Sequence, residues 1–234
     1  MTPTHVAPIN LLLATLPARS RQAFLSGCDR VELSTAQVVL RSGEQIRHVY
    51  FPLDCYMFLV AGADNGQRLE VGMVGDEGML GVSVMLGVAV APHAVVVQGA
   101  GAALRMGTLV FQRQCGRNSA LSRGLKRYAY VLMDQLAHAV FCTHYHVVEA
   151  RLARWLLMTR DRAHANQFRL THETLSVLLG ARRAGVTRAA SSLRRRKLIR
   201  YSRGNITIVD ERGLEAAACS CYAKDRNIYA KVLS

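Results

Sequence analysis

The stretch from residue 118 to residue 163 constrains the fold most, because it contains no proline and a single glycine, Gly124. Within it, apolar and small polar side chains recur at alternating steps of four and three residues, the spacing of a helix that packs along another helix. These positions are Leu121, Leu125, Tyr128, Leu132, Gln135, Ala139, Cys142 and His146. A second apolar stripe beside them, Leu136, Val140 and Val147, indicates contacts with both the chain's own N-terminal part and a partner. We predict a long dimer helix that breaks near residue 145, followed by a helix from about 147 to 160.

A different pattern occupies residues 31–112, where short apolar runs alternate with turn residues. The segment 64–66, Asp-Asn-Gly, predicts a hairpin between two alternating runs, and Gly99 with Gly101 predicts a tight corner. Several short strands at this spacing favour a β-sandwich or barrel. A helical segment at 17–27 precedes them and closes on a glycine at the expected C-cap. The fold class predicted from these patterns is α+β.

The positive charge of the chain is concentrated in one region. The net charge is +14, yet residues 1–150 sum to only +2, whereas residues 151–212 carry 15 basic and 4 acidic side chains. A basic module of about 60 residues therefore follows a nearly neutral region of about 150. Such a concentration of cations favours phosphate backbones or anionic lipid as partners and does not by itself choose between them.

Residues 171–197 carry the pattern of two short helices joined at a glycine. Thr171 suits a helix N-cap, Glu173 suits the positive helix end, and Gly180 separates the helices. The apolar positions are Leu175, Leu178 and Leu179 in the first helix, and Val186, Ala189, Ala190 and Leu193 in the second. The opposite face of the second helix is rich in arginine, which is typical of a helix-turn-helix. The alternating residues around 203–205 predict a following β-hairpin, or wing.

An arginine on the exposed first turns of the second helix can present a planar fork to guanine. We expect Arg182, Arg183, Thr187 and Arg188 to be the base readers, and the remaining contacts to reach phosphates. The predicted DNA-contacting residues are Thr171, His172, Arg182, Arg183, Thr187, Arg188, Ser191, Arg194 and Arg203. The run from Arg194 to Lys197 alone would be weak evidence, since most such runs are solvated surface.

The apolar segments of the sequence indicate neither a membrane role nor export. The uncharged span at 78–97 has only about 14 residues before Pro92, whereas a bilayer crossing needs about 20. The N-terminal residues lack the basic n-region of an export signal. We therefore expect no membrane partner and a cytoplasmic location.

The six cysteines include no C-x-x-C pair, so isolated buried thiols are the default interpretation. His138, Cys142 and His146 recur every four residues on one helical face, with His144 nearby, and such spacing can bind a transition metal or haem. Because the same positions lie on the predicted dimer seam, packing against the partner chain is the favoured interpretation. The three residues stay weak metal candidates, and the sequence assigns no role to Cys219 and Cys221.

With these motifs in place, the whole chain resembles the Crp/Fnr family of bacterial transcription regulators. The most specific part is LTHETLSVLLGARRAGVTRAASSLRRRKLIRYSRGNITIVD, followed by GLEAAACSCY. The resemblance implies a cyclic-nucleotide-binding-like β-roll at 1–117, a dimerisation helix at 118–146 and a winged helix-turn-helix at 147–234. It also implies a homodimer on a palindromic double-stranded DNA site and a contact with RNA polymerase.

The recognition helix departs from the family pattern, which often begins with Ser-Arg-Glu and carries a later arginine. Arg182 stands in the serine position, Arg183 and Arg188 match the arginines, and Ala184 replaces the glutamate. Without a carboxylate at 184 there is no acceptor for a cytosine amino group, so we expect a different half-site.

The resemblance implies an effector site in the β-roll, where Gly75, Glu77 and Gly78 lie near the expected Gly-Glu turn. A structural role for Glu77, bonding amides of its own loop, is an equally good interpretation. His93 lies where nucleotide-binding members have an arginine pair, so a cyclic phosphate would lose its bidentate partner. Cyclic AMP is therefore disfavoured, although another ligand could use the same hollow. An iron-sulfur cluster is also disfavoured, because no cysteine precedes Cys28. The effector stays unknown.

The sequence thus predicts a sequence-specific DNA-binding regulator. The alternative is a small-molecule or haem-binding sensor that acts through a protein partner, with its basic face making only non-specific polyanion contacts. We expect no enzyme, since no Ser-His-Asp order, phosphate loop or paired acids stand out.

Overall fold

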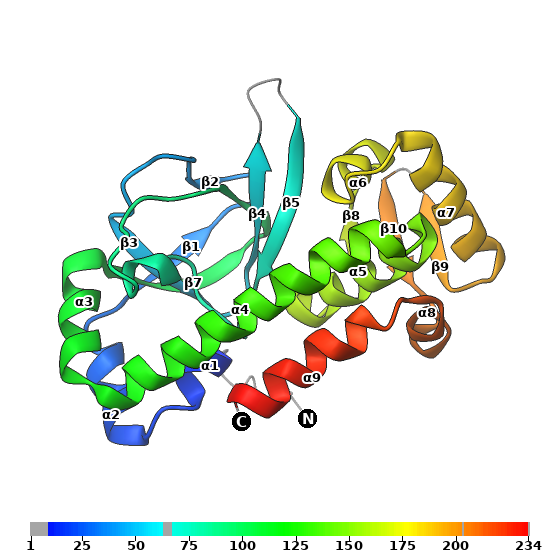
Figure 1. The fold of residues 1–234 in the computed structure, drawn as a ribbon. Coiled ribbons are helices and arrows are strands. Elements are labelled where there is room, and N and C mark those ends of the chain that lie inside the picture. The colour runs from blue at the N-terminus through cyan, green and yellow to red at the C-terminus, as the bar shows by residue number, and fades with distance from the viewer. Residues whose placement is uncertain (1–8, 63–66, 203, 234) are drawn as a thin grey trace, which may run out of the picture.

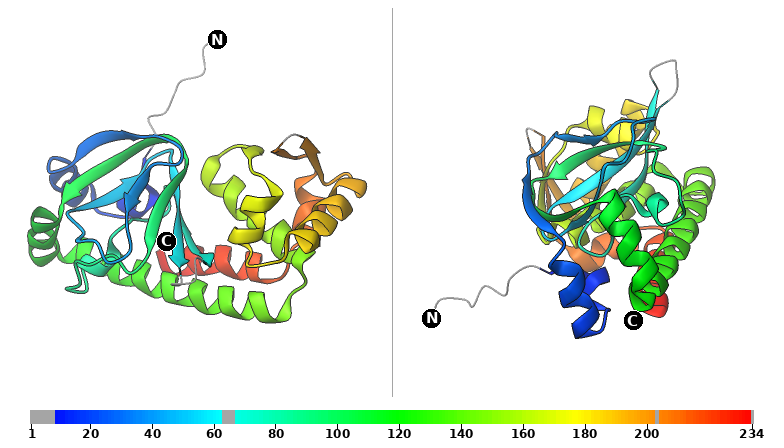
Figure 2. Two further views of the ribbon diagram at one scale, coloured as in Figure 1. Left: turned by 90° about the horizontal axis from the view of Figure 1, so that it is seen from above. Right: turned by 90° about the vertical axis from the view of Figure 1, so that its left-hand side faces the viewer.

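The computed structural model of the chain describes residues 9–62, 67–202 and 204–233. It is an α+β structure with an N-terminal β-roll, a long helix and a C-terminal module of helices and a small sheet, as Figures 1 and 2 show. The β-roll begins with α1 (Leu11–Ala14) and α2 (Ala18–Leu25), so the helix expected at 17–27 is present and ends just before Gly27.

Two antiparallel sheets form the β-roll. Its strands are β1 (Asp29–Leu33), β2 (Val38–Leu40), β3 (His48–Pro52), β4 (Tyr56–Gly62), β5 (Arg68–Val74), β6 (Ala94–Gly99) and β7 (Gly101–Gly107), with a short helix η1 at Val82–Val84. One sheet has the order β1-β7-β3 and the other β2-β6-β4-β5. Fully buried side chains such as Phe51, Met57 and Val97 fill the core between them. Alternating apolar residues in short strands account for this arrangement.

The glycine corner predicted at 99 and 101 is where the chain passes from β6 to β7, and thus from one sheet to the other. Gly101 has φ +153°, and a Cβ there would collide with the Asp54 side chain, whose carboxylate accepts a hydrogen bond from the Ala102 amide. The predicted hairpin tip at 64–66 lies outside the described residues, but β4 and β5 pair antiparallel up to Gly62 and Arg68.

The uncharged span at 78–97 folds as η1, turns and the first part of β6. Among the described residues, no helix has both the length and the apolar character required to cross a bilayer.

After α3 (Thr108–Arg117), the long helix expected at 118–146 is observed as α4 (Ser119–Tyr145). The Asn118 side chain caps it by accepting a hydrogen bond from the Leu121 amide. His146 and Val147 are extended, with ψ of 140° and 152°, and α5 (Val148–Ala163) follows. The break predicted near residue 145 is therefore present.

The prediction that the four-and-three seam of α4 faces a partner chain is wrong. Leu121, Leu125 and Tyr128 are at most 1% exposed and belong to the β-roll core, while Cys142 packs against the C-terminal segment. The C-terminal helix α9 (Cys221–Leu233) returns along α4 and covers part of this face (Figure 1). The exposed apolar side chains of α4 are Tyr130, Met133, Leu136, Val140, Phe141 and Tyr145. The second stripe, not the first, is thus open to solvent.

The C-terminal module consists of α5, β8 (Gln167–Arg169), α6 (His172–Leu178), α7 (Arg183–Arg195), β9 (Ile199–Ser202), β10 (Asn205–Ile208) and α8 (Glu211–Ala217). Its sheet has the order β8-β10-β9, and β9 and β10 form the predicted wing. Its core continues into the β-roll, because Phe58 of β4 makes an edge contact with Trp155 of α5 at 5.5 Å between ring centres. The Trp155 indole donates a hydrogen bond to Glu70 of β5.

Candidate nucleic-acid interface

Helix α6 and the turn after it fix the position of α7. The Thr171 hydroxyl accepts a hydrogen bond from the Thr174 amide at 3.1 Å, which is the predicted N-cap. Gly180 has φ +55°, and a Cβ there would lie 2.8 Å from Leu69 of the β-roll. Glycine is needed at this corner because other residues are strained in the left-handed region. Arg151 of α5 also donates a hydrogen bond to the Leu179 carbonyl, which ties the turn before Gly180 to α5.

Helix α7 is amphipathic in the predicted sense. Val186, Ala189, Ala190 and Leu193 are at most 5% exposed and hold the helix to the module. Arg182 occupies the N-cap position, and α7 begins at Arg183. The exposed residues on the outer side and in the last turn are Arg182, Arg183, Ala184, Thr187, Arg188, Arg194 and Arg195. Ser191 is half-buried, and Arg203 lies outside the described residues.

The guanidinium groups at the start of α7 have no acidic partner. In the part of the chain that the structure describes, no carboxylate forms an ion pair with Arg182, Arg183 or Arg188. Arg196, by contrast, donates to Glu149 of α5 at 2.8 Å, so this part of the 194–197 run is engaged within the chain. The three arginines on the face that the sequence assigned to base reading therefore keep their positive charges free of an acidic partner among the described residues.

His172 lies inside the interface rather than on its surface. Its ring stacks on Tyr201 of β9 at 4.3 Å, and its Nδ1 forms a hydrogen bond with the Thr187 hydroxyl at 3.1 Å. Its Nε2 is covered by protein atoms. Burial and the charge of Arg183 lower the pKa of His172, so the neutral ring is favoured. His172 therefore positions Thr187, and Tyr201 is a supporting residue that the alternating wing pattern alone did not reveal.

The predicted effector residues do not gather in one pocket of the β-roll. Glu77 accepts hydrogen bonds from the Gly75 amide at 3.1 Å and from the Arg162 guanidinium of α5 at 2.8 Å. A Cβ on Gly78 would collide with Tyr128 of α4. The turn at 75–78 thus contacts α4 and α5. His93 is half-buried just before β6, and none of the described contacts links it to this turn.

A mostly apolar cavity of about 470 Å³ lies beside this turn. Its lining comes from α1, the 75–78 turn, α4, α5 and α9, and includes Asp76, Glu77, Gln135, Arg162 and Tyr229. The hollow therefore lies where the β-roll meets the C-terminal half of the chain, outside the core between the two sheets.

The weak metal candidates separate in the structure. His138 bonds Asp225 of α9 at 3.0 Å, whereas Cys142 and His146 lie beside Cys219 and Cys221, to which the sequence assigned no role. The expectation of isolated thiols is therefore wrong for three of the six cysteines, because α9 brings its first turn against the end of α4.

Comparisons with known proteins agree with this architecture. Residues 150–217 match a family model described as the Crp-like helix-turn-helix domain. None of the curated proteins matches the chain. FixK2 from Bradyrhizobium japonicum has a similar structure, with a TM-score of 0.70 at 14% identity, over 82% of this chain and 98% of that one.

Two further solved structures share the fold. One, assigned to the Crp/Fnr family and from Eubacterium rectale, gives a TM-score of 0.68 at 15% identity, over 88% of this chain and 96% of the other. The other, a transcriptional regulator of the CRP family from Thermus thermophilus, gives 0.67 at 18% identity, over 80% and 96%. The fold and the matched domain together define a DNA-binding transcription regulator with a helix-turn-helix. Residues 150–217 thus belong to the Crp-like family of helix-turn-helix domains, and the chain as a whole shares the fold of the solved Crp/Fnr regulators.

Proposed function

We propose that the protein is a homodimeric transcription regulator that reads a palindromic DNA site with α7. The observation that carries this proposal is the group of exposed arginines, Arg182, Arg183 and Arg188, which lack an acidic partner among the described residues at the start of a Crp-like recognition helix. Guanidinium groups there can bond guanine O6 and N7, and the positive helix end adds to the attraction for DNA. A regulator of this kind acts in the cytoplasm, on DNA and through RNA polymerase.

The half-site should differ from that of family members with a glutamate in the recognition helix. Ala184 is exposed and offers no acceptor for a cytosine amino group. The other base readers are left to specify the site, and among them Arg183 and Arg188 favour guanines at the positions they reach.

The exposed stripe of α4 supports the homodimer. Met133 is 69% exposed and Val140 is 72% exposed, on the same helix as Tyr130 and Leu136. A contiguous apolar stripe is costly in water, and pairing two copies of α4 would bury it. Two copies related by a two-fold axis would place their α7 helices about one turn of DNA apart, roughly 10 to 11 base pairs.

Val140→Asp tests the dimer, because it places a charge in the centre of the stripe. We expect light scattering to report a monomer for this variant. Leu109→Asp is the matched control, since Leu109 is 75% exposed on α3, away from the stripe. A Val140→Asp protein that stays dimeric would contradict the α4 interface.

The 75–78 turn supports a route from the β-roll to the DNA-binding module, since Glu77 bonds Arg162 of α5 directly. A ligand that displaced this contact would change how α5 carries α6 and α7. Cyclic AMP is disfavoured as that ligand because no arginine occupies the 92–94 segment.

Selection from a random double-stranded DNA pool tests the proposed function. The wild-type protein should enrich a palindrome, and Arg183→Ala should cost about 1 to 3 kcal/mol on that site and relax one base position in each half. Lys197→Ala is the control for backbone contacts, because it should weaken all sequences alike. Equal affinity for the enriched and scrambled DNA would overturn the proposal and favour a sensor that acts through a protein partner.

A further inference from the structure

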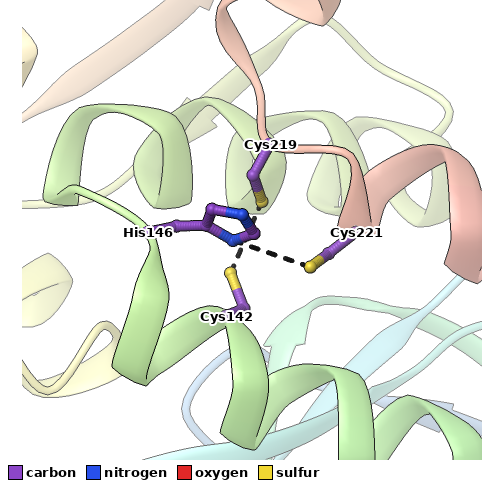
Figure 3. Close-up of side chains that lie close together, drawn as sticks. All are labelled: Cys142, His146, Cys219 and Cys221. Atoms are coloured by element: carbon purple, nitrogen blue, oxygen red, sulfur yellow. Dashed lines mark hydrogen bonds between the residues drawn. The ribbon is translucent and has the colours of Figure 1, made fainter.

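Three cysteines and one histidine converge where α4 ends. Cys142 lies in the last turn of α4, His146 follows that helix, and Cys219 and Cys221 lie between α8 and α9 and at the start of α9 (Figure 3). The ligand atoms of all four side chains lie within 4.8 Å of one another. The Cys142 and Cys219 sulfurs are 3.4 Å apart, and the Cys221 sulfur is 3.7 Å from His146 Nδ1.

The separations of 3.4 and 3.7 Å are close to the edges of a small tetrahedron, and the other pairs of ligand atoms lie no farther than 4.8 Å apart. A zinc ion bound at about 2.3 Å to sulfur and about 2.1 Å to nitrogen has S–S edges of about 3.8 Å and S–N edges of about 3.6 Å. Three thiols and one imidazole are a ligand set of closed, structural zinc sites. Magnesium and calcium prefer oxygen ligands, and a multi-iron cluster would need its ligands spread around a larger inorganic core.

The surroundings suit a buried charged centre. Cys142, Cys219 and Cys221 are 2%, 8% and 0% exposed, so solvent does not reach three of the four ligands freely. Three thiolates and one divalent cation sum to one negative charge. The Arg154 guanidinium lies close enough for its positive charge to act on all three thiols, and it is held in place by Asp225. A guanidinium is therefore fixed beside the site, with Asp225 as its ion-pair partner.

We propose that Cys142, His146, Cys219 and Cys221 bind a single zinc ion in tetrahedral coordination. The ion ties the end of α4 to the start of α9. His146 and Val147 are the extended residues between α4 and α5, so the metal also fixes the angle at which the long helix carries the DNA-binding module.

Metal analysis of the full-length protein, purified under reducing conditions, tests the site. We expect one zinc per chain in the wild type, and a cobalt-substituted form with the intense visible bands of tetrahedral thiolate coordination. Cys142→Ser and Cys219→Ser should each lose the bound metal. Cys115→Ser should keep it, because Cys115 is half-buried in α3, outside the cluster.

The cysteine-to-serine variants could lose metal because they fail to fold. His146→Cys controls for this, since four thiolates also bind zinc. It should retain one metal per chain with a shifted cobalt spectrum. A metal-free reduced wild type that binds neither added zinc nor cobalt would overturn the proposal. So would a Cys142–Cys219 disulfide in protein handled without air, or iron with inorganic sulfide in place of zinc. Metal content is measured without DNA, so this experiment tests the zinc site independently of the proposed DNA-binding function.

The proposed effect of the zinc on the angle between α4 and α5 is tested on the wild type alone. Chelation of the zinc should lower the thermal midpoint and weaken binding to the enriched palindrome at least tenfold, and added zinc should restore both. If metal is bound but its removal leaves DNA affinity unchanged, the proposal that the metal fixes the angle between α4 and α5 is wrong.

Discussion

Replacing Glu77 by glutamine should uncouple the β-roll from the C-terminal module at a measurable cost in stability. Glu77 and Arg162 are 15% and 7% exposed in their side chains, and Oε1 lies 2.8 Å from Nε. Burial alone would lower the pKa of Arg162, but the charge of Glu77 beside it raises that pKa, so the guanidinium stays charged. Glutamine keeps the shape of the side chain and removes its negative charge, and its single oxygen can accept from the Gly75 amide or from Arg162 but not from both.

The expected cost follows from the burial of the pair. Removing one partner of a buried ion pair costs about 3 to 5 kcal/mol, because the other charge is left without compensation. The adjacent cavity of about 470 Å³ borders both side chains and admits water to the site, so we expect the lower end, about 3 kcal/mol. For a chain of this size, that corresponds to a fall of roughly 6 to 12 °C in the thermal midpoint.

Urea unfolding followed by circular dichroism measures this cost. Arg162→Met combined with Glu77→Gln should be less destabilising than Glu77→Gln alone, because no buried charge is then unpaired. Glu215→Gln is the matched control, since its pair with Arg226 is exposed on both sides and should contribute at most about 1 kcal/mol. If Glu77→Gln cost no more than this control, the turn would not be held by Arg162, and Glu77 would be free to serve a ligand.

Glu70 and two glycines of the C-terminal module provide further tests. Burial raises the pKa of Glu70 to about 7, against the opposing hydrogen bond from Trp155, so the folded state holds a proton that the unfolded state has lost. The contribution of Glu70 to stability should therefore be fully present below about pH 4.5 and be lost as the pH rises to about 7, whereas Glu70→Gln should lack this part of the pH dependence. The fluorescence of Trp155, the only tryptophan, should titrate with the same midpoint, and a midpoint near 4.5 would refute the assignment. Gly180→Ala should destabilise the module by about 1 to 2 kcal/mol through its left-handed backbone and its contact with Leu69, as denaturant unfolding would show. Gly185→Ala in α7 should instead add about 0.5 to 1 kcal/mol, because its Cβ would meet only Val148 at 3.9 Å, and a loss there would contradict the packing.

Patterns in the sequence correctly predicted the features that depend on residues close together in the chain. The cap at Thr171, the corner at Gly180 and the buried stripe from Val186 to Leu193 all depend on residues within two turns of each other. The same holds for the break after α4 and for the glycine corner between β6 and β7. Helix capping and side-chain periodicity act over such distances, so they are visible in one sequence without any knowledge of the fold.

Long-range contacts required the tertiary structure. The spacing of apolar residues in α4 predicted two packed faces, but periodicity does not say which neighbour covers which face. In the folded chain, the β-roll and α9 cover one face of α4, and the second apolar stripe is left exposed to solvent. Glu77 was similarly placed in a plausible effector turn by sequence, and its ion pair with Arg162 depends on how α5 approaches the β-roll.

The sequence by itself determined the basic helix-turn-helix, the β-rich N-terminal half and the long helix between them, because each follows from local spacing and charge. Only the tertiary structure decided that Cys142 and His146 meet Cys219 and Cys221. A ligand set drawn from the end of one helix and the start of another exists only once the chain has folded back on itself. Neither C-x-C nor C-x₃-H carries that information alone, since each pair supplies half of a tetrahedron.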